Sequence, residues 1–145
     1  MATVKIYKNQ ETLFEGIPWN FTDSEVVVYL KSNTINSEYI NILKSLIEFK
    51  DEILSNWFNV SVKTFRSFKE PDYIFKENTK EQLVLLVSLM KHGLRVFDTK
   101  SEFEQWLSQP NFHFDSQPPL TFLTTVSGIH FVDDRLTALE YGDNV

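Results

Sequence analysis

The sequence contains no cysteine, and glycine occurs only four times in its 145 residues. A chain without cysteine forms no disulfides or thiolate zinc sites, offers no thiol nucleophile, and suits a reducing cytoplasm. So few glycines argue against a Gly-rich phosphate loop, and neither a P-loop nor a GxSxG motif occurs. The common nucleotide-binding and serine-hydrolase motifs are therefore excluded.

Long apolar segments are missing as well. No run approaches the roughly 18 apolar residues of a membrane span. The N-terminus MATVKIYKNQ has no apolar stretch of the kind found in secretory signals. We therefore expect a cytoplasmic protein that does not contact membranes. Its 42% hydrophobic and 14% aromatic residues still suffice for a substantial core.

Negative charge is concentrated in the second half of the chain. The net charge is −6; residues 1–70 carry 8 basic and 9 acidic side chains (−1), whereas residues 71–145 carry 6 and 11 (−5). Neither half has the basic excess of a general nucleic-acid binder, so DNA contact would need a local patch. The acidic half suits a basic protein partner or pocket.

The few candidate catalytic or metal-binding groups do not form a recognisable pattern. No two of the three histidines, His92, His113 and His130, stand at the spacing of a helical zinc site, and HExxH is absent. Asp133 and Asp134 could be read as metal carboxylates, but we interpret them as first-turn acids that complement the dipole of the last helix. No catalytic residue, metal site or cofactor is expected, and an enzyme has little support.

Apolar residues recur at helical spacing along most of the chain, which predicts an all-α fold. The segment TVKIY alternates like a strand, but it has no pairing partner. The strongest pattern, KEQLVLLVSLMKHGLRVF, predicts a helix in which Gly93 either loosens the backbone or admits a close neighbour. The helices are expected to begin at Asp23 or Ser24, at Ser37, ahead of Ile53, after Ser61, at Thr79, after Asp98 or Thr99, at Pro118 or Pro119, and near Ile129, the last of them after a stop at Gly128.

The stretch DEILSNWFNVSVKTFRSFK predicts a helix-turn-helix. FNV would be the turn, and the second helix would run from Val62 to about Lys69 before Pro71. Residues 61–69 carry a charge of +3 within an acidic protein. DNA contact and a merely solvated helix face both stay open. The candidate DNA-binding residues are Ser61, Lys63, Thr64, Arg66, Ser67 and Lys69.

The C-terminal third carries an ordered set of short motifs. These are Gly93, Val96 and Phe97; Phe103; Trp106 and Leu107; Pro110 and Asn111; Pro119 and Leu120; Leu123 and Thr124; Gly128; and Glu140, Tyr141 and Gly142. In this order and spacing the segment resembles the toxin-binding domain of the Xre/MbcA/ParS antitoxins. The chain has Asp115 and Ser116 where that family usually has Gly, and Ala138 where it usually has Arg. Upstream, Ser61 and Thr64 resemble the Ser–x–x–Thr that opens the recognition helix of these antitoxins, and the likeness spans roughly residues 26–145.

The resemblance implies an antitoxin of a type II toxin–antitoxin pair. Its C-terminal domain would bind and occlude a cognate toxin, most often a RES-domain enzyme that consumes NAD. The N-terminal part would dimerise or bind operator DNA to repress its own operon. We therefore expect a homo-oligomer or a toxin–antitoxin hetero-oligomer, without catalysis or cofactor in this chain.

Three segments follow from this interpretation: an N-terminal extension (1–22), an Xre-like helix-turn-helix region (23–77) and a toxin-binding domain (78–145). The last helix has one apolar face, so its other face and the tail, with a side-chain and a terminal carboxylate, are expected to meet the toxin. The candidate toxin-binding residues are Arg135, Glu140, Tyr141, Gly142, Asp143, Asn144 and Val145.

One alternative from another class stays open. The chain could be a stand-alone helix-turn-helix transcriptional regulator whose C-terminal domain only oligomerises. The aromatic residues do not discriminate between an antitoxin and such a regulator, because most of them, Trp106 included, lie on apolar helix faces and are expected in the core. Phe112 and Phe114 are the exceptions, since a loop carries them.

Overall fold

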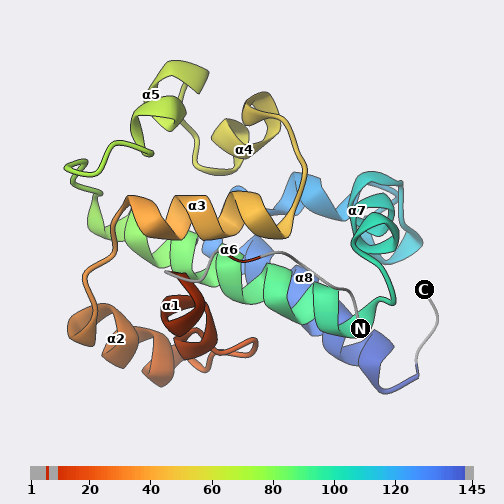
Figure 1. The fold of residues 1–145 in the computed structure, drawn as a ribbon. Coiled ribbons are helices and arrows are strands. Elements are labelled where there is room, and N and C mark those ends of the chain that lie inside the picture. Colours follow the sequence, from red (N-terminus) through yellow and green to blue (C-terminus); the bar gives the residue numbers. More distant parts are fainter. Residues whose placement is uncertain (1–5, 7–9, 143–145) are drawn as a thin grey trace.

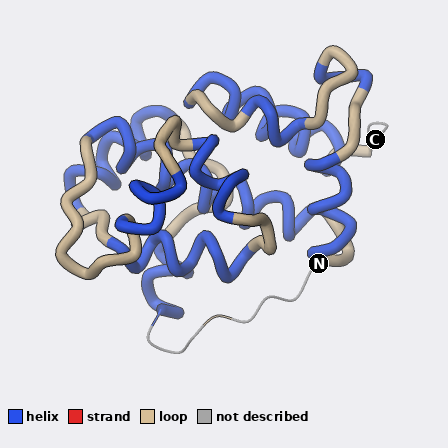
Figure 2. The backbone as a smooth tube through the Cα atoms, turned by 90° about the horizontal axis from the view of Figure 1, so that it is seen from above, coloured by secondary structure: helices blue, strands red, loops and turns tan. Residues whose placement is uncertain are grey.

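The computed structural model describes residue 6 and residues 10–142, and within them the backbone forms helices and loops without a strand (Figures 1 and 2). The all-α prediction is therefore confirmed. The segment TVKIY lies almost wholly outside the described residues. The elements are α1 (Glu11–Gly16), α2 (Asp23–Ser32), α3 (Ser37–Leu46), α4 (Asp51–Trp57), α5 (Val62–Ser67), α6 (Glu77–Val96), α7 (Lys100–Ser108), the 3₁₀ turns η2 (Phe112–Phe114) and η3 (Pro119–Phe122), and α8 (Val126–Glu140).

Helix α6 is the axis of the fold. It packs against α2, α3, α7 and α8, and Figure 1 shows it crossing the centre of the molecule behind α3. Twelve of the thirteen residues from Gln82 to Leu94 are buried, so the helix is covered on nearly every side. It begins at Glu77, two residues before the predicted start at Thr79. No membrane span exists among the described helices, since none is both long and apolar enough to cross a bilayer.

Side-chain caps define the starts of the N-terminal helices. Helix α2 begins at Asp23, but its capping residue is Thr22 rather than the predicted Asp23 or Ser24. The Thr22 hydroxyl accepts a hydrogen bond from the Glu25 amide, and the Glu25 side chain accepts one from the Thr22 amide. This reciprocal capping box satisfies two amides that helix geometry leaves unpaired. Helix α3 begins at Ser37, as expected, and the Asn36 side chain caps it by accepting a hydrogen bond from the Glu38 amide.

The short helices α4 and α5 stand where the helix-turn-helix was predicted. Asn59, in the turn between them, has a left-handed φ of 56°. The hydroxyl of Ser61 accepts a hydrogen bond from the Thr64 amide and begins α5, as expected. The helix ends at Ser67 rather than near Lys69, because the amides of residues 68–70 bond the carbonyl oxygens three residues back instead of four.

The segment after α7 differs most from its prediction. Gly128 was expected to stop one helix, but it lies inside α8, whose amino-terminal cap is Thr125. The glycine is needed for a close approach instead: a Cβ at this position would overlap the Phe122 carbonyl oxygen. Gly93 has the similar role that we allowed for, because a Cβ there would overlap the Phe103 ring.

The loop between α7 and α8 is compact and contains two 3₁₀ turns. Asp115 and Ser116 both have left-handed φ angles, 55° and 60°. These are the positions where the antitoxin family usually has Gly, the residue that adopts this conformation without strain. Phe114 is buried against Trp106 and Phe131, whereas Phe112 is 87% exposed.

We predict that Gly128→Ala lowers the free energy of unfolding by about 2–3 kcal/mol, because the new methyl group meets backbone that cannot rotate away. Gly16→Ala is the matched control: Gly16 is also helical, but its Cβ would meet nothing within 4 Å. Urea unfolding of both variants measures the difference. Equal stability of the two variants would show that α8 moves freely relative to η3.

Candidate functional site

Helix α8 presents an exposed stripe on the side opposite its buried face. Ile129, Val132 and Leu136 are buried in the core. The opposite side, at spacings of three and four residues, is here called the α8 outer stripe. It consists of Ser127, Phe131, Asp134, Ala138 and Tyr141, of which all but the half-buried Ala138 are exposed. With Phe131 at 44% and Tyr141 at 85% exposure, the stripe carries two of the six large exposed hydrophobic side chains of the described residues.

The predicted toxin-binding residues fall into three groups. Tyr141 and Gly142 are exposed at the end of α8. Arg135 and Glu140 are half-buried, and the Glu140 carboxylate faces inward, where it bonds α6. Asp143, Asn144 and Val145 lie outside the described residues. The assignment of these residues to toxin binding stays a prediction.

The carboxyl-terminal half of α8 is bonded to α6 through a buried histidine. His92 has no exposed surface; its Nδ1 lies 2.6 Å from Asp133 Oδ1 and its Nε2 lies 3.2 Å from Glu140 Oε1. Each ring nitrogen must carry a proton to donate both hydrogen bonds, so the geometry fits the imidazolium form. Burial opposes protonation, but Asp133 and then Glu140 outweigh it, and the pKa of His92 is raised.

This histidine cluster revises the interpretation of Asp133. We expected Asp133 and Asp134 in the first turn of the last helix, but α8 begins at Val126. Asp133 therefore lies in mid-helix and faces His92, while Asp134 is exposed on the α8 outer stripe. Within the described part of the chain, no group of three or more His, Cys, Asp or Glu side chains is placed to hold a metal ion.

The segment around α1 covers this cluster. The Trp19 ring lies 4.9 Å from the His92 ring, and the Arg95 guanidinium lies 4.6 Å over Trp19 while its Nε is 3.0 Å from Glu140. Lys91 donates to the carbonyl oxygens of Phe14, at 2.6 Å, and of Ile17. The described part of the N-terminal extension is therefore bonded to the helix that positions the end of α8.

We predict that the protein loses stability as the pH rises through the raised pKa of His92. The stabilisation by the imidazolium is complete below the unfolded-state value of about 6.5 and disappears above the folded-state value. As the pH rises from 5.5 to 9, the urea midpoint of the wild type should fall, and that of His92→Gln should fall less. His113→Gln is the control and should behave like the wild type, because the His113 side chain is exposed. A direct NMR titration of the His92 ring in the wild type serves if His92→Gln does not fold. A ring pKa at or below 6.5 would contradict the prediction.

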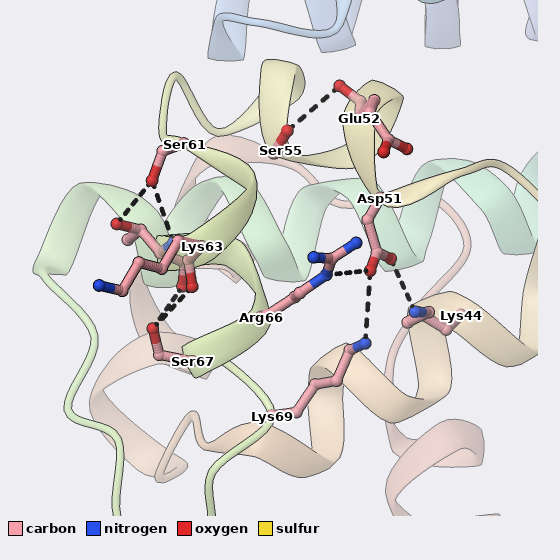
Figure 3. Close-up of polar contacts among 10 residues, drawn as sticks. Lys44, Asp51, Glu52, Ser55, Ser61, Lys63, Arg66, Ser67 and Lys69 are labelled. Carbon is pink, nitrogen blue, oxygen red and sulfur yellow. Dashed lines mark hydrogen bonds and ion pairs between the residues drawn. The ribbon is translucent and has the colours of Figure 1, made fainter.

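The predicted DNA-binding residues lie on or beside α5, but they differ in whether their side chains already make contacts within the protein. The hydroxyl groups of Ser61, Thr64 and Ser67 hydrogen-bond within the helix and its cap. Lys63 is exposed and points away from Asp51 in Figure 3. Their role in DNA contact stays a prediction.

Three cations converge on Asp51, the first residue of α4. Lys44 Nζ lies 2.9 Å from Oδ1, while Arg66 Nε and Lys69 Nζ lie 3.2 Å and 3.7 Å from Oδ2 (Figure 3). These four residues are here called the Asp51 cluster. The hydrogen bond from Lys44, then that from Arg66, outweighs burial and lowers the pKa of Asp51. The sequence reasoning missed Lys44 and Asp51, because they lie outside the predicted recognition helix.

The fold thus defines a helical protein with an exposed stripe on α8 and a pair of short helices bearing a basic cluster. Residues 92–142 match the family model of the antitoxin Xre/MbcA/ParS C-terminal toxin-binding domain. The resemblance drawn from the sequence motifs is thereby confirmed over this segment, and the family indicates an antitoxin with a toxin-binding C-terminal domain. A comparison with curated proteins finds no match to this chain.

Proposed function

We propose that this chain neutralises a RES-type, NAD-consuming toxin through the α8 outer stripe and the residues that follow it. The observation that carries the proposal is the stripe itself, which lies within residues 92–142 and exposes Phe131 and Tyr141. Aromatic side chains are the residues that interface centres favour. The RES type rests on the family resemblance and on the acidic second half of the chain, which suits a cationic pocket.

The rigid support of this stripe favours a binding role. An interface gains affinity when its residues are ordered before the partner arrives. The buried face of α8 and the hydrogen bonds of His92 hold the helix on α6 up to Glu140. Tyr141 follows directly and is exposed, so a partner would meet it at a fixed position.

Ala138 also belongs to this surface. It replaces the Arg that the antitoxin family usually has, and it lies on the α8 outer stripe between Asp134 and Tyr141. A partner of this chain therefore meets a small apolar side chain rather than a cation at this point. We propose that this difference makes the chain selective for its own toxin.

We predict that Tyr141→Ala weakens the complex with the cognate toxin at least tenfold, as expected for an interface aromatic residue worth more than about 1.4 kcal/mol. Phe112→Ala is the matched control, because Phe112 is an equally exposed aromatic residue of the same domain. Calorimetric binding and rescue of toxin-expressing cells measure both effects. An unchanged affinity for Tyr141→Ala, or a loss only with Phe112→Ala, would rule out this surface.

A truncation after Glu140 tests the following residues as a group. It preserves the bonds of Glu140 to His92 and Arg95, which a truncation after Leu139 would remove. The truncated protein should unfold at the same urea concentration as the full chain but fail to protect cells from the toxin. Full protection would show that neutralisation lies elsewhere.

A second candidate function is repression of the chain's own operon through operator DNA. The observation that favours it is the pair α4 and α5 at the predicted helix-turn-helix, with Lys63 exposed on α5. In this proposal residues 23–77 contact DNA and residues 78–145 bind toxin, in a homo-oligomer or a toxin–antitoxin assembly. The alternative, a transcriptional regulator with an oligomerising C-terminal domain, predicts the same DNA contact without a toxin.

We predict that Lys63→Ala weakens binding to the promoter DNA and reduces the slope of log affinity against log salt by about one unit, the effect of one lost phosphate contact. Lys31→Ala is the control, since Lys31 is an exposed cation on α2, which lies on the other side of α3 from α5 (Figure 1). Fluorescence anisotropy between 50 and 200 mM salt measures the slope. Equal slopes for the two variants would exclude Lys63 from the contact.

A further inference from the structure

The Asp51 cluster has more positive than negative charge. Lys44, Arg66 and Lys69 supply three cations, and Asp51 supplies one carboxylate, which leaves a local charge of +2 in a chain of net charge −6. Lys44 and Lys69 both approach the same carboxylate, which holds their like-charged ammonium groups near each other, so the two repel. A second anion at this place would relieve that repulsion.

The geometry leaves room for such an anion. Asp51 contacts Arg66 through Nε alone, and the Arg66 side chain is 61% exposed. The two terminal guanidinium nitrogens have no partner among the described residues, and they are the pair that binds phosphate oxygens side by side. Lys44 and Lys69 are about one-third exposed and flank Asp51 on other sides. The carboxylate thus holds three cations together without enclosing them.

We propose that the Asp51 cluster is a binding site for backbone phosphates of DNA, in which Lys44 of α3 contributes a contact from outside the helix-turn-helix and Asp51 limits the affinity. This inference rests on the proposed DNA-binding function and names the residues that set its strength. Asp51 both positions the cations and competes with the phosphates for them. DNA therefore binds with moderated, salt-sensitive affinity.

The composition of the cluster favours DNA over an acidic protein. The three cations come from α3, from α5 and from the residue two positions beyond α5, and they surround one point rather than forming a row. Lys63 lies on α5 and points away from the cluster (Figure 3). Two separated cationic points suit the repeated phosphates of a duplex backbone, which position a protein without reading sequence.

The decisive experiment removes the negative charge but keeps a hydrogen-bond acceptor. Asp51→Asn retains a carbonyl oxygen for Arg66 Nε, so the main change is one unit of charge beside the bound phosphates. We expect the affinity for duplex DNA at low salt to rise roughly 3–10-fold. Glu52→Gln is the matched control, because it removes the same charge from the next residue of α4, which is exposed and makes no ion pair with these cations (Figure 3). Its effect should stay below about twofold.

Removing a cation tests the contribution of α3. We expect Lys44→Ala to weaken DNA binding and reduce the salt slope by about one unit, whereas Lys31→Ala should leave the slope unchanged. Circular dichroism of each variant checks that the helices are retained. The full chain is titrated with a random-sequence duplex and with the promoter duplex of its own operon.

The two duplexes separate this inference from the proposed function. If both duplexes bind equally and only Asp51→Asn strengthens binding, the phosphate site stands and specific autoregulation fails. If the promoter is preferred but Asp51→Asn changes the DNA affinity no more than Glu52→Gln does, autoregulation stands and the phosphate site is overturned. An unchanged salt slope for Lys44→Ala, or no binding of either duplex by any variant, also overturns it.

Discussion

Helix α6 has to bury nearly its whole circumference while the polar groups that it carries find partners. Apolar contacts to α2, α3, α7 and α8 cover it. A polar group that is buried without a hydrogen bond, however, destabilises the fold, and apolar packing does not offset this cost. Gln82, Lys91 and His92 meet this requirement by reaching other segments. The rest of the structure is arranged around these three connections.

Each connection fixes a different part of the molecule. Gln82 donates to carbonyl oxygens of Trp57 and Leu123, and so joins the end of α4 to the chain just before α8. Lys91 holds the segment around α1, and burial lowers its pKa. His92 holds α8 near its end. Helix α6 therefore supports both proposed binding surfaces, the α4–α5 pair and the α8 outer stripe, although the two lie far apart in the sequence.

Local patterns in the sequence predicted most of the helices but not the contacts between them. The apolar spacing of α6 and the short pair α4–α5 were visible because helical periodicity is a property of neighbouring residues. The cap at Thr22 was also readable, as a Thr–x–x–Glu pattern, but it was assigned one or two residues late, to Asp23 or Ser24. Gly128 was misread because glycine serves both as a helix stop and as a point of close approach.

The candidate site depended on information that a single sequence does not hold. His92 meets Asp133 and Glu140 across 41 and 48 residues, and this requires the register of α6 on α8. The carboxylates are seven residues apart and thus share one helix face, a signal that could have suggested a common partner but not its identity. Asp51 likewise meets Arg66 across a turn whose geometry depends on Asn59 in a left-handed conformation.

The contacts also explain why the segment between α6 and α8 is rich in aromatic and proline residues. Gln82 bonds Leu123 near the start of α8, and Arg95 bonds Glu140 at its end, so the two helices run in the same direction. A parallel pair requires the chain to return along the full length of α8, about 22 Å for its 15 residues. The aromatic and proline residues of α7, η2 and η3 make this return compact: Trp106 and Phe114 pack together, and Pro119 begins the last turn before α8. As a result α8 begins beside the α4–α5 turn, where Asn59 donates to the Thr124 carbonyl, and ends a helix length away at the surface proposed to meet the toxin.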